Sequence, residues 1–183
     1  MRINHRTTLI LTAMSLLVLP LVAYGDDNDG PAREFRANLQ GRNEVPLTLS
    51  AARGRLALTV NATDTSVHFV LQYMGLQTMV TASHIHVAQP NVNGGVTVFF
   101  CGGGGRPACP QGQGTVEGDF TAADVLALPT QQLEVNNLAK LLAAIRAGKT
   151  YANLHTQTSP AGEIRGQIMP EERRRFGPGD DEQ

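Results

Sequence analysis

Two histidines, His84 and His86, stand two positions apart in the segment SHIHVA. Successive side chains of a β-strand point to opposite faces, so both imidazoles would share one face while Ile85 and Val87 point to the core. Two imidazoles on one strand face can bind a single metal ion, and imidazole suits copper, zinc, nickel and iron. The segment therefore indicates a metal site.

Two later segments also carry polar side chains at alternate positions. These are Tyr151, Asn153 and His155 in TYANLHT, and Glu163, Arg165 and Gln167 in GEIRGQI. The positions between them, such as Leu154 and Ile164, are apolar, as expected of strands with one buried face. These polar faces strengthen the interpretation of a metal site. They also fit a solvated sheet face on which Glu163 and Arg165 form an ion pair.

The chain has two cysteines, Cys101 and Cys109, at the ends of the glycine-rich segment CGGGGRPAC. Their spacing excludes a CxxC redox or metal motif. In an oxidising compartment the pair would form a disulfide that closes a short loop. A pair of soft metal ligands is the alternative.

The N-terminal segment has the three parts of a secretory signal peptide. Arg2 and Arg6 precede an apolar run over residues 9–23, and small residues stand at Ala23 and Gly25. We place cleavage after Gly25, which predicts a periplasmic or secreted protein. A retained anchor is the alternative, but the apolar run is shorter than the roughly 20 residues of a comfortable bilayer span.

The charge of the mature chain indicates which partners to expect. Without the signal peptide, 13 of the 15 Lys and Arg remain against 16 Asp and Glu, a formal net charge of −3. This balance indicates neither a nucleic-acid partner nor a membrane surface. The mature length suits one domain of ordinary size.

Short alternating runs separated by turn residues must position the candidate ligands. Strands are predicted at 35–39, 54–60, 66–73, 80–88, 96–100, 112–120, 151–155 and 163–168. A short capped turn starts at Thr121, and a helix over 135–147 ends before Gly148. Residues 26–34 are expected to be a flexible segment, 35–169 the domain, and 170–183 a disordered charged tail. This pattern predicts a mainly β sandwich or barrel with a small helical insertion.

Several blocks of the sequence resemble the CHRD family, the domain repeated in chordin and found singly in exported bacterial proteins. They are FRANLQGRNEVP, GLQTMVTASHIHVA, the cysteine loop, and IRAGKTYANLHTQTSPAGEIRGQI, together covering roughly residues 35–168. CHRD domains in turn are similar to the copper/zinc superoxide dismutase fold, an antiparallel Greek-key sandwich. In that fold the strand with two copper ligands resembles the segment from Gly75 to Val87, and a later strand ends in a third copper histidine.

The resemblance implies that His84, His86 and His155 are copper ligands. Asn153, Glu163 and Arg165 would then surround them, orienting imidazoles or tuning charge. The chain departs from the dismutases because no histidine lies between His86 and the helix, so no zinc is expected in the dismutase manner. His68 stands out of phase with its apolar neighbours, so we expect it to be solvated.

The leading hypothesis is an exported copper-binding protein with its histidine site at the surface of a dismutase-like sandwich. One alternative is a metal-free interaction module whose histidine face contacts another exported protein. Another is a weak superoxide-handling copper oxidoreductase in which Arg165 steers a small anion toward the metal. We do not predict catalytic residues.

Overall fold

The computed structural model describes residues 30–171. The predicted signal peptide lies outside this range, as do residues 26–29 of the predicted flexible segment and 172–183 of the predicted tail. None of the helices in the described range is both long and apolar enough to cross a membrane.

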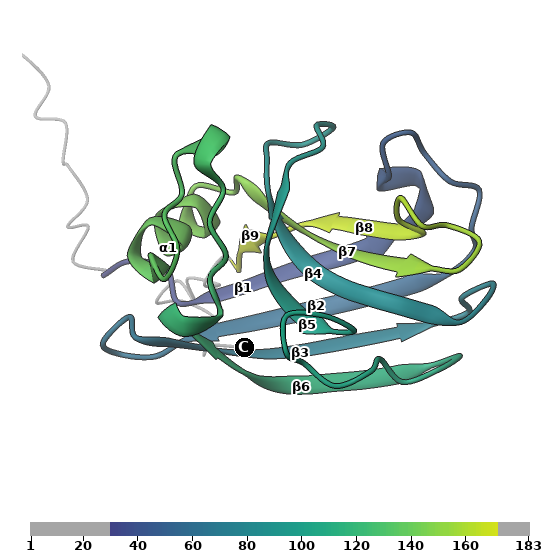
Figure 1. Cartoon of the computed structure of the whole chain (residues 1–183), viewed down its shortest axis with the longest axis horizontal. Coiled ribbons are helices and arrows are strands. Elements are labelled where there is room, and N and C mark those ends of the chain that lie inside the picture. Colours follow the sequence, from purple (N-terminus) through teal and green to yellow (C-terminus); the bar gives the residue numbers. More distant parts are fainter. Residues whose placement is uncertain (1–29, 172–183) are drawn as a thin grey trace, which may run out of the picture. The chain divides into compact units, whose positions relative to one another are not determined.

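Within that range nine strands form one antiparallel sheet in the order β5-β4-β7-β8-β1-β2-β3-β6, with β9 paired to β1 (Figure 1). The strands are β1 Glu34–Gln40, β2 Arg53–Val60, β3 Ser66–Met74, β4 Val80–Val87, β5 Gly95–Cys101, β6 Gly114–Thr121, β7 Thr150–Thr156, β8 Ile164–Gln167 and β9 Met169–Pro170. The edge strands β5 and β6 contact each other, so the sheet forms a nearly closed barrel. The predicted fold class is confirmed.

The helical insertion follows β6. The helix α1 spans Leu138–Arg146, later than predicted because Asn137 caps it by accepting a hydrogen bond from the backbone of Lys140. Short 3₁₀ turns occur at η1 Gly41–Asn43, η2 Ala122–Asp124 and η3 Pro129–Gln131. The predicted capping box between Thr121 and Asp124 is present, but it opens only the turn η2.

The alternation of the strands determines which residues fill the barrel. Ile85 of β4, Leu154 of β7 and Ile164 of β8 are fully buried in the core. Ile85 therefore points inward as predicted, and Val87 packs against the core while partly exposed. Burying these apolar side chains is the main stabilising contribution to such a domain.

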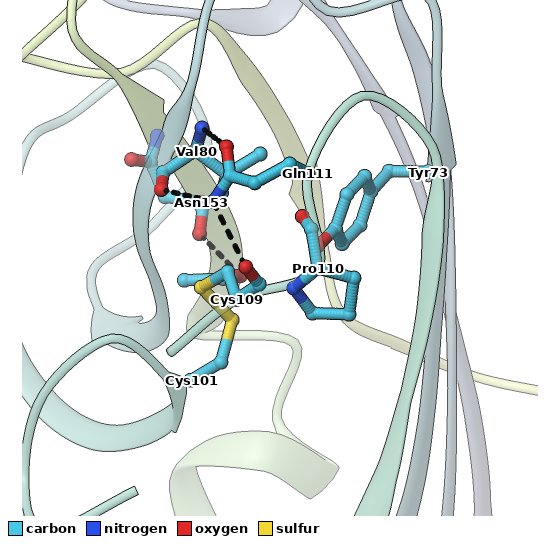
Figure 2. The surroundings of a disulfide bond; sticks show 8 residues. Tyr73, Val80, Cys101, Cys109, Pro110, Gln111 and Asn153 are labelled. Atoms are coloured by element: carbon cyan, nitrogen blue, oxygen red, sulfur yellow. Dashed lines mark hydrogen bonds between the residues drawn. A yellow bond between two sulfur atoms is a disulfide. The ribbon is translucent and has the colours of Figure 1, made fainter. Parts of the chain in front are cut away.

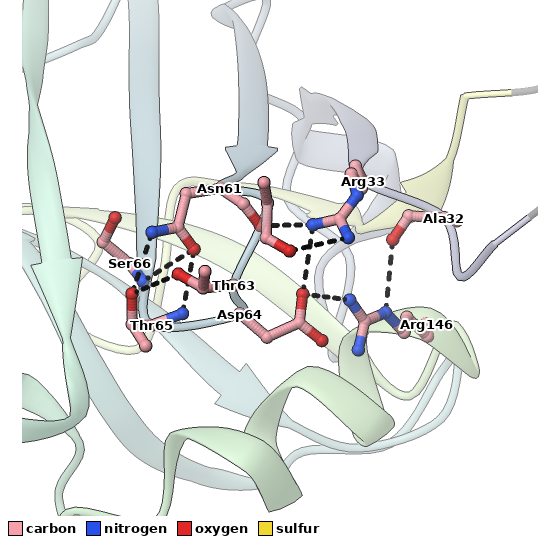
Figure 3. Close-up of polar contacts among 9 residues, drawn as sticks. Ala32, Arg33, Asn61, Thr63, Asp64, Thr65, Ser66 and Arg146 are labelled. Carbon is pink, nitrogen blue, oxygen red and sulfur yellow. Dashed lines mark hydrogen bonds and ion pairs between the residues drawn. The ribbon is translucent and has the colours of Figure 1, made fainter.

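A polar clamp joins the β2–β3 turn to the start of the domain and to the helix (Figure 3). Asp64 adopts a left-handed conformation with φ 57°, and its Oδ1 accepts from Arg146 Nη2 at 2.9 Å and from Arg33 Nη1 at 3.3 Å. Asn61 closes the turn because its Oδ1 accepts from the backbone of Thr65. Two arginines from distant segments thus fix one hairpin.

Cys101 and Cys109 form the predicted disulfide, with Cα atoms 5.0 Å apart (Figure 2). Gln111, just beyond the loop, accepts from the backbone N–H of Val80 at 2.8 Å and donates to its carbonyl at 3.1 Å. The hydroxyl of Tyr73 donates to the carbonyl of Pro110 at 2.6 Å. The loop is therefore attached to the start of β4, the strand that carries His84 and His86.

The outward faces of β4, β7 and β8 are also largely buried, whereas an antiparallel sheet commonly exposes one face to water. The connection between β1 and β2, which contains η1, lies against β8 (Figure 1). Its Asn43 donates to the carbonyl of Arg165 at 3.0 Å, and Thr48 donates to the carbonyl of Glu163 at 2.7 Å. Loops thus cover this part of the sheet and enclose a polar layer.

Candidate metal centre

The three predicted ligands converge on the outward face of neighbouring strands. In the register of β4 and β7, His84 pairs with Asn153 and Ala82 pairs with His155. The ring of His84 lies 4.6 Å from that of His86 and 4.5 Å from that of His155, measured between centroids. One nitrogen from each ring lies within 4.8 Å of the other two. A single ion can therefore reach all three side chains after small adjustments.

Hydrogen bonds fix the tautomers of two of these rings. His86 Nδ1 lies 2.9 Å from the carbonyl of Gly94, and His155 Nδ1 lies 3.0 Å from the carbonyl of Pro160. A carbonyl only accepts, so Nδ1 carries the proton in both rings, and Nε2 of the neutral imidazole keeps a free lone pair. This is the arrangement in which a histidine binds a metal through one nitrogen while the other donates to a carbonyl.

One nitrogen of each ring has no hydrogen-bond partner in the part of the chain that the structure describes. Nδ1 of His84, Nε2 of His86 and Nε2 of His155 are buried and form no hydrogen bond within residues 30–171. Buried polar atoms are nearly always satisfied, so three such atoms in one cluster need an explanation. A metal ion bound by the three lone pairs would satisfy them together.

The site is not at the surface, which corrects the sequence-based expectation. His84 is 6% exposed and His86 is 8% exposed, while His155 is half-buried. The alternation of side chains along each strand correctly predicted that these histidines lie on the outward face. Their burial comes from Phe99, whose ring meets His84 edge-on at 4.9 Å, and from the loop around Gly94.

Burial keeps the histidines uncharged. It lowers the pKa of His84 to about 2, with smaller contributions from the neighbouring His86 and His155. Burial also lowers the pKa of His86 to about 4, although the hydrogen bond to the carbonyl of Gly94 acts to raise it. The pKa of His155 is lowered by burial as well. All three rings are neutral near pH 7, the state in which imidazole binds metals.

Tyr151 and Arg165 stack behind His86. The ring of Tyr151 lies parallel to that of His86 with centroids 4.5 Å apart, and the guanidinium of Arg165 lies 3.4 Å above the tyrosine ring. Arg165 donates to the carbonyl of Val92 at 2.7 Å and to Oδ1 of Asn93 at 3.1 Å. Only 2% of Arg165 is exposed, so this cation is held in the protein and is not free to approach an incoming anion.

Asn153, which pairs with His84 across β4 and β7, connects the histidines to Glu44, an acid that was not predicted from the sequence. Its Nδ2 donates to both carboxylate oxygens of Glu44, at 2.8 and 3.0 Å. Burial raises the pKa of Glu44 to about 7, although the charge of Arg165 and the bonds from Asn153 oppose this shift. The segment around Glu44 has no periodic pattern of apolar residues. The only sequence signal for a functional role of Glu44 was therefore an acidic side chain among turn residues.

Glu163 does not join the histidines. One carboxylate oxygen accepts from Ser50 at 2.7 Å and from the backbone of Gln77 at 3.1 Å, and the other accepts from Thr156 at 2.7 Å. The prediction extended the alternation of β8 back to Glu163, but β8 begins at Ile164. The preceding Gly162 has φ 132° and redirects the chain at this point.

His68 is placed as predicted, away from the cluster. It lies on β3 opposite Asp119 of β6, in the other half of the sheet. Its side chain is 44% exposed and lies 3.4 Å from Glu117 and 3.3 Å from Asp119. It contributes nothing to the buried centre.

The family model of the CHRD domain matches residues 35–168, a range that contains all three histidines. The chain belongs to the CHRD domain family. Comparison with curated proteins and with solved structures finds no match. The likeness to the dismutases therefore rests on the residue patterns alone, and the CHRD domain must be interpreted from its own geometry.

Proposed function

We propose that this CHRD domain is an exported copper-binding protein in which His84, His86 and His155 hold the ion. The supporting observation is that one nitrogen of each ring lies within 4.8 Å of the other two. Each ring also has one buried nitrogen that forms no hydrogen bond within residues 30–171. The donor set fits a metal that accepts imidazole.

Residues around the three histidines hold the imidazole rings in an orientation suited to metal binding. The carbonyls of Gly94 and Pro160 hold two rings in the tautomer that leaves Nε2 free, and Tyr151 restrains the ring of His86 by stacking on it. Less reorganisation is then needed on binding. When bound, copper would supply a centre that changes between its two oxidation states.

Copper is the metal that these donors favour. An all-nitrogen site binds copper more tightly than other divalent first-row metals, including zinc. The disulfide occupies both cysteines, so the alternative of soft thiolate ligands has no support. Three imidazoles also leave room for a further ligand.

Export is supported by two independent features. The N-terminal segment has the composition of a secretory signal peptide, with Arg2 and Arg6 before the apolar run over residues 9–23. The disulfide between Cys101 and Cys109 is typical of proteins that fold in an oxidising compartment. Both favour a periplasmic or secreted location.

The two rival hypotheses have less support. An interaction module that offered its histidine face to a partner would expose these side chains, whereas His84 and His86 are buried. A superoxide-handling enzyme that used Arg165 to steer an anion would need that guanidinium free, whereas it is bonded to Val92 and Asn93.

Copper titration against a competing chelator tests the proposal, using protein made without a histidine tag. Replacing His84, His86 or His155 with Ala should weaken copper binding by about 100-fold or more, because each removes a ligand. His68→Ala is the matched control and should bind like the unaltered protein. Unchanged affinity in all three ligand variants would contradict the proposal, as would an equal loss in the control.

A loss of copper affinity in a variant must be distinguished from unfolding of that variant. His155 is the least buried of the three ligands, so His155→Gln should preserve the apo domain best while still removing the predicted donor. Thermal unfolding of each apo variant gives the reference. A variant that is folded like the parent and still binds copper equally would show that its histidine is not a ligand.

A further inference from the structure

A trough crosses the outer face of β1, β2, β3 and β6, in the half of the sheet away from the histidines. It encloses about 680 Å³. None of its lining residues belongs to the proposed copper site or contacts its three histidines, so the trough is a separate feature of the domain.

One wall is a continuous row of polar side chains. The strand registers place Asn38 opposite Arg55, Arg55 opposite Gln72, and Gln72 opposite Thr115. All four residues are exposed and line the trough. The row runs perpendicular to the strands, and three strand spacings of about 4.8 Å give it a length of roughly 14 Å.

The other wall lies two residues further along each strand. Gln40 pairs with Arg53, and Arg53 pairs with Met74, with Gln113 at the end of the same wall. Residues two apart on a strand have Cα atoms about 7 Å apart, so the two walls rise from the sheet about 7 Å apart at their bases. An elongated chain one residue thick fits such a space.

The floor consists of backbone. Leu39, Gly54, Tyr73 and Gly114 pair in sequence between the two walls. The side chains of Leu39 and Tyr73 are buried on the inner face, at 0% and 3% exposed, so they present only main-chain atoms to the trough. Exposed ligand-binding groups therefore come from the walls.

The trough is cationic because its arginines have no acidic partners. No Asp or Glu lines it, and within residues 30–171 neither Arg53 nor Arg55 forms an ion pair. Arg42 is equally unpaired and lines an adjoining hollow that shares Gln40 and Arg53. By contrast Arg33, Arg36, Arg106 and Arg146 are all paired with carboxylates. Of the four arginines in residues 30–171 that form no ion pair, Arg42, Arg53 and Arg55 gather at this place, and only the buried Arg165 lies elsewhere. The chain as a whole carries a net negative charge.

The composition of the walls identifies the class of ligand. Guanidinium groups bind carboxylates, and carboxamides and hydroxyls both donate to and accept from sugar hydroxyls. The walls have no aromatic side chain, which disfavours stacking of nucleobases. The floor strands already pair with each other, so an acidic peptide cannot add to the sheet here. We propose that the trough binds an acidic polysaccharide, a chain of uronate sugars lying across the four strands.

Isothermal titration with short oligouronates, such as alginate fragments, tests this proposal. The double variant Arg53→Gln/Arg55→Gln should weaken binding by about tenfold or more, because two charge-assisted contacts are lost. Raising the salt from about 0.1 M to about 1 M should also weaken it, since the Debye length falls from about 10 to 3 Å. A neutral oligoglucan of equal length should not bind measurably.

Arg36→Gln is the matched control. Arg36 lies on the same face of β1, two residues from Asn38, but pairs with Glu171 and does not line the trough. Its variant should bind oligouronate like the parent, and both variants should unfold at the parental temperature. Equal binding by the double variant would overturn the proposal. So would the absence of oligouronate binding, including the case in which anionic vesicles or single-stranded DNA bind instead.

Discussion

The ring of Tyr151 lies 5° from parallel to the ring of His86, and both side chains bond to the same glycine. His86 Nδ1 donates to the carbonyl of Gly94, and the backbone N–H of Gly94 donates to the hydroxyl of Tyr151 at 3.3 Å. One loop residue and one aromatic ring therefore fix the orientation of a single imidazole.

Replacing Tyr151 separates the two contributions. Tyr151→Phe keeps the stacked ring and loses only the bond to Gly94, so the free energy of unfolding should fall by about 1 kcal/mol. Tyr151→Leu loses the stacking as well and should cost about 2–3 kcal/mol. Copper affinity should follow the same order. Chemical denaturation of the apo domain and copper titration measure the two effects; equal behaviour of both variants would show that the stacking is unimportant.

Gly94 itself should not tolerate a side chain. A Cβ atom at this position would lie 1.9 Å from the carbonyl oxygen of Val87, so Gly94→Ala must displace the loop and its bond to His86. We expect weaker copper binding by about tenfold, comparable to loss of a residue that orients a ligand. Gly30→Ala, with no atom within 4 Å of the added Cβ, is the control. Copper titration of both variants checks this; parental affinity in Gly94→Ala would contradict it.

The apo domain should lose stability as the pH falls below about 6.5. Its unfolded histidines take up protons there, whereas the folded pKa values are about 2 for His84 and about 4 for His86. Each fully shifted group contributes about 1.4 kcal/mol per pH unit, so each of the two histidines costs roughly 2 kcal/mol of stability at pH 5, or roughly 4 kcal/mol together.

Glu44 acts in the opposite direction. Its folded pKa of about 7 lies above the ordinary value of 4.5, so protonation on folding adds stability as the pH falls through that window. The stability lost at His84 and His86 together exceeds the stability gained at Glu44. The free energy of unfolding should therefore fall by a net amount of about 2 kcal/mol between pH 7.5 and pH 5. Urea unfolding at the two pH values measures it. Glu44→Gln removes the opposing contribution and should steepen the loss; unchanged or greater parental stability at pH 5 would contradict the assignment.

The face of each candidate ligand could be predicted from the sequence, but its surroundings could not. Alternation in SHIHVA and in TYANLHT put His84, His86 and His155 on outward faces, and the strand registers bring them together. Burial depends on the loop around Gly94, which has no periodic pattern to identify it as a cover. The acid beside Asn153 is Glu44, 109 residues earlier in the chain, so local spacing contains no signal for it. Glu163 was misplaced because alternation holds only within a strand.

The pH dependence expected of the proposed copper binding illustrates this difference between face and surroundings. An exposed histidine has a pKa near 6.5, so the sequence alone predicts that binding weakens as the pH falls through that value. Burial lowers the pKa of all three candidate ligands, so proton competition is weaker and copper binding should persist to a lower pH. A chelator titration at several pH values distinguishes the two expectations; a midpoint at 6.5 would mean that the ligands are solvated in the apo protein.

The disulfide should support the metal centre as well as the fold. Cys101 pairs with Ser83, the residue before His84, and the loop that it closes packs on Phe99 through Gly103 and Gly104. The ring of Phe99 in turn meets that of His84 edge-on.

Opening the loop should therefore loosen one wall around His84. The double variant Cys101→Ser/Cys109→Ser should lower the free energy of unfolding by about 2.5 kcal/mol, the loop-entropy value for a closed segment of this length. Copper affinity should fall as well, whereas Gln113→Ala, in the exposed segment beyond the loop, should change neither quantity. Urea unfolding and copper titration of the two variants test this. Lowered stability with parental copper affinity would show that the disulfide serves the fold alone and that His84 keeps its position without it.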